Sequence, residues 1–159
     1  MKIVVIGGSG LIGSRLVALL NKAGHEALAA SPRTGVNAVT GEGLSNALVS
    51  ADVVVDVTNA PSWEPQAALD FLRNSARYLG KAEVAAGVRY HVALSIVGCD
   101  CTPEKAHFTA RCAQEEVIDA AGVPYTMTPA PQFMEFIDGI ADFRTDSGTV
   151  YLRSRSPRR

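Results

Sequence analysis

Three glycines near the amino terminus have a spacing suited to phosphate binding. Gly7, Gly10 and Gly13 read G-x-x-G-x-x-G, after a run of β-branched residues and at the start of an apolar pattern of helical period. In such a turn Gly7 would let the chain leave the strand, Gly10 would let the backbone approach a ligand, and Gly13 would pack the helix against the sheet. Free N–H groups at the helix start favour anions. The pattern predicts that these glycines hold the pyrophosphate of a dinucleotide.

Two other interpretations of this stretch are a glycine-rich turn without a ligand and a secretory signal. Glycine-rich turns between a strand and a helix also occur where no nucleotide binds, and that alternative stays open. A secretory signal would also combine a Lys, an apolar run and small residues. Here the glycines interrupt the apolar run at its centre and no A-x-A-like cleavage site follows, so we reject a signal peptide.

The residues after the second predicted strand bear on the choice of nucleotide. An acidic residue there would hold a ribose diol, whereas a basic one accommodates a 2′-phosphate. This chain has Ser31 and Arg33 at that position, and no Asp or Glu between Glu26 and Glu42. A hydroxyl and a guanidinium suit a phosphate dianion. We therefore expect NADP(H) in preference to NAD(H), the alternative being that Arg33 is a solvated loop charge.

Strand and helix patterns alternate along the whole chain. This alternation predicts an α/β fold, a doubly wound parallel sheet in a three-layer α/β/α arrangement. Ligands of such sheets bind outside the carboxyl ends of the strands, which would bring the loops at 7–13, 31–33, 58–62, 95–98 and 129–132 together. The predicted strands are 2–6, 25–30, 36–39, 51–57, 88–97 and 124–128, and the predicted helices 11–24, 43–49, 65–86, 103–121 and 132–143.

Composition narrows the class of protein. A chain of 159 residues, 47% apolar and 19% charged, suits one globular domain, which we place at residues 1–152. No apolar run reaches the roughly 18 residues of a membrane span. Cys99, Cys101 and Cys112 are an odd number, which favours a reducing compartment, so we expect a cytoplasmic protein. The C-x-C pair lacks further ligands at zinc spacing, and we predict no metal site.

Charge is unevenly distributed. Residues 1–152 carry 11 basic and 16 acidic side chains, a net charge of −5, while the tail at 153–159, RSRSPRR, adds four arginines. We expect this tail to be disordered. It is either a basic tail for RNA or an anionic surface, or the artificial end of a shortened gene; we favour the second interpretation, because nothing else in the chain indicates nucleic-acid binding.

Several segments carry a resemblance to a known family. The chain resembles the NmrA-like, atypical members of the short-chain dehydrogenase/reductase superfamily from residue 1 to about residue 150. The segments concerned are GGSGLIG, SPRTGV, ADVVVDVTNAPS, HVALSIVG and GVPYTMTPAPQFMEF. The resemblance implies a Rossmann fold that binds NADP(H). It also implies a C-terminal portion over the nicotinamide, which we expect to be missing from this shortened chain. Its loss would uncover apolar surface and predicts dimerisation or marginal stability.

The resemblance assigns roles to the loop residues. Leu11 and Ile12 would lie under the pyrophosphate and the nicotinamide side, and Arg33 near the 2′-phosphate. The adenine and ribose edge would be lined by Thr58, Asn59 and Ala60.

The usual catalytic pair of the superfamily is missing. Its reductases use Tyr-x-x-x-Lys on the helix after the fifth strand, helped by a Ser at the end of that strand. Ser95 takes the place of the helper, but the helix has His107 and Arg111, and none of the four tyrosines begins a Tyr-x-x-x-Lys. Because a histidine side chain ordinarily titrates near neutrality, His107 would donate a proton, or it is an exposed polar residue beside the cofactor. Arg111 would bind a ribose hydroxyl or phosphate, without a part in proton relay.

Two functions follow as expectations. The first is an oxidoreductase that transfers hydride between NADP(H) and a small carbonyl or quinone-like substrate, with Ser95 and His107 polarising the acceptor oxygen. The second is a non-catalytic NADP(H) sensor that binds a protein partner, as the resemblance to NmrA-like proteins implies.

Overall fold

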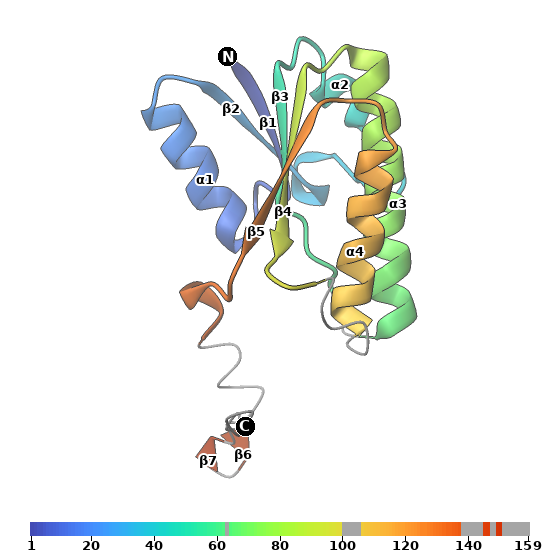
Figure 1. Ribbon diagram of the computed structural model, residues 1–159. Helices are drawn as coiled ribbons and strands as arrows, with labels where there is room; N and C mark the ends of the chain where they lie inside the picture. The colour runs from blue at the N-terminus through green and yellow to red at the C-terminus, as the bar shows by residue number, and fades with distance from the viewer. Residues whose placement is uncertain (63, 100–105, 138–144, 147–148, 151–159) are drawn as a thin grey trace.

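The computed structural model describes residues 1–62, 64–99, 106–137, 145–146 and 149–150 (Figure 1). Strands and helices alternate along this part of the chain, as predicted. The strands are β1 (Lys2–Ile6), β2 (Glu26–Ala30), β3 (Val53–Asp56), β4 (Tyr90–Ile96), β5 (Tyr125–Ala130), β6 (Thr145–Asp146) and β7 (Thr149–Val150). The helices are α1 (Leu11–Lys22), α2 (Leu44–Ala47), α3 (Pro65–Ala86) and α4 (Ala106–Asp119), with the 3₁₀ turns η1 (Pro32–Thr34) and η2 (Met134–Phe136).

Five of the strands form one parallel sheet. Their order is β2-β1-β3-β4-β5, and β6 pairs with β7 in a separate antiparallel hairpin. In the register of the central strands, Val4 lies between Leu28 and Val54. Parallel strands buried on both faces favour short runs of β-branched residues, which is what β1 and β3 contain. The predicted Rossmann-type α/β fold is confirmed.

Helices cover both faces of the sheet. Figure 1 shows α1 on one side and α3 beside α4 on the other. The larger core lies between the sheet and the second helical layer, where Val4, Val54 and Leu79 are fully buried. Glu64 caps α3 by accepting hydrogen bonds from the N–H groups of Gln66 and Ala67, and Gly87 ends the helix in the left-handed conformation. The three-layer prediction is confirmed.

The predicted strand at 36–39 is wrong. Asn37 forms only an isolated bridge with Glu42. The loop folds back on itself instead: the Asn37 N–H donates to the Glu42 carbonyl (2.8 Å), and Gly43 lies so close to Gly35 that a Cβ there would be 3.2 Å from the Gly35 carbonyl carbon. Val36 is buried against α2, so its apolar character serves a packed loop rather than a strand. As a consequence β2 is the edge strand of the sheet.

Side chains occupy the outer backbone groups of β2. Asn21 on α1 accepts a hydrogen bond from the Ala27 N–H (3.0 Å) and donates one to the Ala27 carbonyl (3.2 Å). The Thr34 hydroxyl donates to the Ala29 carbonyl (3.1 Å). These are groups that an incoming strand would pair with, so the edge is partly sealed by its own chain.

Some of the predicted segments lie partly or wholly outside the residues that the structure describes. Of the predicted helix 132–143 the structure describes 132–137, where Met134–Phe136 form η2. The tail at 153–159 and Cys101 lie outside the described residues. Among the helices the structure describes, none has both the length and the apolar character to span a membrane.

Candidate functional site

The glycine turn lies between β1 and α1, at the carboxyl edge of the sheet. Gly7 has a φ of +80° and donates its N–H to the Ala30 carbonyl (2.9 Å) at the end of β2. A Cβ at Gly7 would come within 3.2 Å of the Thr58 nitrogen in the loop after β3. The turn therefore needs glycine both for its backbone conformation and for its close contact with that loop.

Two further glycines bring backbone segments together. A Cβ at Gly13 would lie 2.7 Å from the Gly8 Cα, so α1 sits directly against the turn. A Cβ at Gly8 would lie 2.6 Å from the Val5 carbonyl oxygen and 2.7 Å from the Ala29 Cα. The role predicted for Gly13 matches this packing. Gly8 was missed, although the Gly7-Gly8 pair was visible in the sequence.

The start of α1 is open to a ligand. Gly10, the N-cap, is exposed, and no side chain caps the helix. The first intrahelical hydrogen bond runs from the Ser14 N–H to the Gly10 carbonyl, which leaves the N–H groups of Leu11, Ile12 and Gly13 without a helical acceptor. These donors and the positive end of the helix dipole form an anion-binding position.

The loop after β2 places Ser31 beside this turn and continues into η1 with Arg33. Ser9, in the glycine turn, donates a hydrogen bond to the Ser31 hydroxyl (2.7 Å). Ser31 caps η1 together with Thr34, whose hydroxyl accepts the Ser31 N–H (2.9 Å). Arg33 is exposed within η1. Ser9 and Thr34 join the residues predicted from sequence as parts of this corner.

The loop after β3 is fixed from below by a buried polar network. Asp56 is 1% exposed and accepts the Thr58 N–H (2.8 Å). Arg111, which is 5% exposed, donates to the Thr58 carbonyl (3.2 Å) and to Asn59 Oδ1 (3.2 Å). Gln114 joins the two charges, because it accepts from Arg111 (2.6 Å) and donates to Asp56 (2.9 Å).

Arg111 lies beneath the loop rather than in an open cleft. Burial lowers the pKa of Arg111, and the carboxylates of Asp56 and Glu115 oppose that shift. Its Nε and the Thr58 hydroxyl are buried without a hydrogen-bond partner among the described residues. The helix face that holds Arg111 was predicted, whereas its contact with a loop more than fifty residues earlier in the chain was not.

Ser95 lies near the end of β4 and is buried against α4. Its hydroxyl donates a hydrogen bond to Glu115, and Cys99 Sγ lies 3.6 Å from the same carboxylate oxygen. Glu115 is a polar partner that sequence reasoning missed, although it continues the four-residue spacing of His107 and Arg111. His107 is within α4, but its side chain lies outside what the structure describes.

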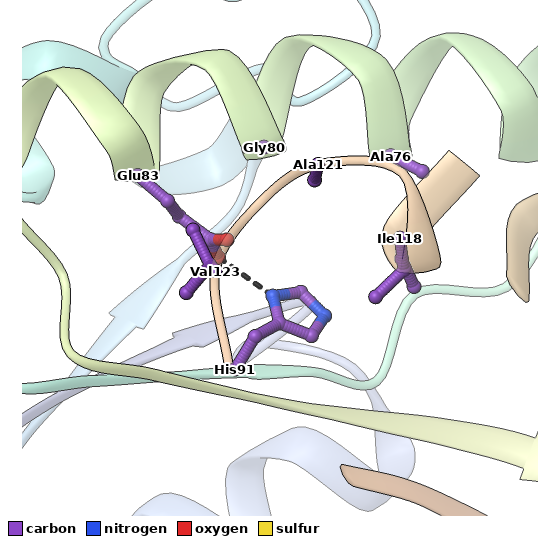
Figure 2. Close-up of a pocket in the computed structure, with 7 residues that line it drawn as sticks. All are labelled: Ala76, Gly80, Glu83, His91, Ile118, Ala121 and Val123. Atoms are coloured by element: carbon purple, nitrogen blue, oxygen red, sulfur yellow. Dashed lines mark hydrogen bonds and ion pairs between the residues drawn. The ribbon is translucent and has the colours of Figure 1, made fainter. Parts of the chain in front are cut away.

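A second buried polar pair lies at the other end of β4. Figure 2 shows the imidazole of His91 facing the carboxylate of Glu83 on α3, with 2.7 Å between Nδ1 and Oε1. Burial opposes the charge on His91, but the hydrogen bond to Glu83 and the attraction of Glu83 and Asp56 raise its pKa. Burial likewise raises the pKa of Glu83, against the lowering effect of His91. Both raised pKa values favour a bound proton on this pair, which lies at the opposite end of β4 from Ser95.

A known family matches the greater part of the chain. The model of the NAD dependent epimerase/dehydratase family matches residues 3–124. The chain belongs to this family. The match covers the strands β1 to β4, ends just before β5, and includes the network beneath the loop after β3.

Three solved structures illustrate the similarity of fold. A short-chain dehydrogenase/reductase superfamily protein from Agrobacterium tumefaciens with bound NAD is 21% identical, with a TM-score of 0.68 over 81% of this chain and 48% of that one. The UDP-N-acetylglucosamine 4-epimerase from Bacillus cereus is 18% identical, with a TM-score of 0.70 over 81% and 53%. The Bordetella bronchiseptica enzyme WbmG in complex with NAD is 19% identical, with a TM-score of 0.69 over 81% and 52%.

The chain spans about half the length of these three structures. At such identities the likeness concerns the fold alone. No curated protein matches the sequence.

Proposed function

We propose that this epimerase/dehydratase family member binds a nicotinamide dinucleotide across the carboxyl edge of its sheet. The glycine turn carries the proposal: it leaves the start of α1 uncapped, and the exposed Gly10 presents no Cβ to an approaching pyrophosphate. Gly7, Gly10 and Gly13, with Leu11 and Ile12, would hold the phosphates. Remaining contacts are assigned to Ser31, Arg33, Thr58, Asn59, Ala60 and Ser95.

The proposal includes a preference for NADP(H). Ser31 is held beside the glycine turn by Ser9, and the exposed Arg33 is free to reach a phosphate on the ribose. The corner contains no carboxylate that would select a ribose diol. The Agrobacterium protein and WbmG carry NAD, so the preference rests on this chain's own residues.

Titration calorimetry with NADPH and NADH tests the nucleotide and its selection. Replacing Arg33 with Ala should weaken NADPH binding roughly tenfold to a hundredfold, the worth of a charge-assisted hydrogen bond, and leave NADH nearly unchanged. Arg73→Ala on α3 removes an exposed arginine elsewhere and is the matched control. Equal loss of both nucleotides, or no loss of NADPH binding, would remove Arg33 from the phosphate site.

We further propose an oxidoreductase function. A bound nicotinamide supplies or accepts hydride, and the protein must polarise the oxygen of a small carbonyl or quinone-like substrate. Ser95, near the carboxyl end of β4, is assigned to that oxygen, with His107 as proton donor. Arg111 would hold the loop after β3, which lies on the cofactor side of the site. The protein is proposed to work in the cytoplasm, with a homodimer covering apolar surface.

A regulatory function is the second candidate. Ser95 donates to Glu115, and Arg111 is occupied by the loop after β3, so both groups are engaged inside the protein. Together with the missing Tyr-x-x-x-Lys, this favours an NADP(H) sensor of the NmrA type that binds a protein partner. NADPH oxidation with menadione and 9,10-phenanthrenequinone separates the two functions. Turnover that Ser95→Ala abolishes supports the oxidoreductase, and nucleotide binding without turnover supports the sensor.

A further inference from the structure

The amide of Asn59 has only one orientation that fits its neighbour. Arg111 lies 3.2 Å from the Asn59 side chain. A guanidinium has five N–H donors and no acceptor, so the group that faces it must be the carbonyl oxygen of the amide. The Nδ2 group of Asn59 therefore points away from Arg111. Chemistry of the partner alone decides this orientation.

Arg111 is itself held in place, so the orientation is fixed. It donates to the Gln114 side chain (2.6 Å), to the Thr58 carbonyl (3.2 Å) and to the Leu94 carbonyl (3.4 Å). The guanidinium thus joins α4 to β4 and to the loop after β3. Rotation of the Asn59 amide by 180° would place two N–H donors against this cation, with loss of a hydrogen bond and added repulsion.

The free face of Asn59 lies at the edge of the proposed nucleotide site. Asn59 is exposed, and no described residue accepts a hydrogen bond from its Nδ2 group. Its neighbour Thr58 touches the glycine turn, since a Cβ at Gly7 would lie 3.2 Å from the Thr58 nitrogen. An exposed donor with a fixed direction, next to that turn, suits an acceptor atom on the ligand.

We propose that Arg111 is a positioning residue that fixes Asn59 as a hydrogen-bond donor toward the bound dinucleotide. The atom it meets is an acceptor: a phosphate or ribose oxygen, or a ring nitrogen of adenine. This inference rests on the proposed function and adds to it. It gives the buried arginine a task in nucleotide affinity, in place of a direct contact with the ligand.

The test exchanges the donor for an acceptor of the same shape. Asn59→Asp keeps an oxygen toward Arg111 and gains an ion pair with it, but turns a second oxygen toward the ligand. We expect affinity for NADPH and NADH to fall roughly tenfold to a hundredfold, while the melting temperature stays equal or rises. Asn46→Asp, on the exposed face of α2, makes the same change of charge and should leave affinity within about twofold. A purely structural role for Asn59 would leave affinity unchanged.

Arg111→Lys supplies the second arm. The ammonium keeps the charge but cannot reach the loop and Gln114 in the same geometry, so the Asn59 amide loses its fixed orientation. Affinity should fall by less than in Asn59→Asp, and the double variant should bind no more weakly than Asn59→Asp alone. In ¹H–¹⁵N spectra the side-chain amide signal of Asn59 is identified by its absence from the Asn59→Asp variant. In the wild-type chain this signal should shift when nucleotide is added.

The outcomes are distinguishable. Wild-type affinity in a folded Asn59→Asp, or additive losses in the double variant, would overturn the inference and leave the proposed nucleotide binding intact. A folded wild-type chain that binds neither NADPH nor NADH would refute the proposed function, and the inference with it.

Discussion

Replacing Gly13 with Ala should cost much of the stability of the fold, whereas the same change at Gly10 should spare it. The new Cβ at Gly13 would lie 2.7 Å from the Gly8 Cα and 2.9 Å from the Gly7 carbonyl carbon. Carbon atoms in contact normally lie about 3.5–4.0 Å apart, so α1 would have to move away from the turn by about 1 Å. Both obstacles are backbone atoms, which no side-chain rotation can relieve.

The size of the effect follows from that displacement. Overpacking a well-packed site costs about 1–3 kcal/mol, and with backbone on both sides we expect the upper end, about 3 kcal/mol. For a chain of this length that corresponds to a fall in melting temperature of roughly 6–12 °C. At Gly10 the new Cβ would meet only the Gly7 carbonyl oxygen, at 3.2 Å, and the φ of −79° is open to any residue. We expect a cost of about 0.5–1 kcal/mol there.

Urea unfolding and calorimetric titration, performed on both variants, separate the two roles. Gly10→Ala should unfold nearly like wild type but bind NADPH and NADH at least about tenfold more weakly, because the methyl group stands where the pyrophosphate approaches. Gly13→Ala should be destabilised before any ligand is added. Equal stabilities of the two variants would refute the packing argument. Undiminished nucleotide binding by Gly10→Ala would refute the assignment of the turn to phosphate.

Two other predictions concern stability and association. Because the pKa of His91 is raised in the folded state, the stabilisation it provides is present below the unfolded value near 6.5 and is lost as pH rises through the folded value. Urea unfolding should show that the wild-type chain loses stability as pH rises above that unfolded value, and Glu83→Gln should abolish this loss. Asn21→Ala should uncover the Ala27 N–H and carbonyl at the edge of β2 and so raise the rate of aggregation. Light scattering at 37 °C measures this rate, with Asn46→Ala as the control. Equal rates for the two variants would show that Asn21 does not protect the edge.

Much of the fold was readable from the sequence because its signals are local. The β-branched runs of β1 and β3, the helical period of α3 and the glycines of the first turn each act within a few residues. The failure at Val36 has the opposite cause. An apolar residue in a short run looks the same whether it is buried in a strand or under a folded loop, and the contact with α2 that decides between them is tertiary.

The candidate site divides in the same way. The glycine turn and the loop residues follow from motif and strand position. The direction of Arg111 does not, because its partners lie on β4 and in the loop after β3. A helical period predicts which face a residue shares with its neighbours, but it does not predict which backbone carbonyls that face will meet. Glu115 was missed for the same reason, since only the folded chain brings it to Ser95.

The buried polar pairs under α3 and α4 also determine how these helices can be seated on the sheet. Glu83 must meet His91, and Gln114 must meet Asp56, so each helix is matched to one strand position. A slide by one helical turn, about 5.4 Å, would keep apolar contacts of similar area but leave buried charges unpaired. A purely apolar interface would tolerate several alignments of the helices on the sheet. Here the two polar pairs select a single alignment of the helical layer.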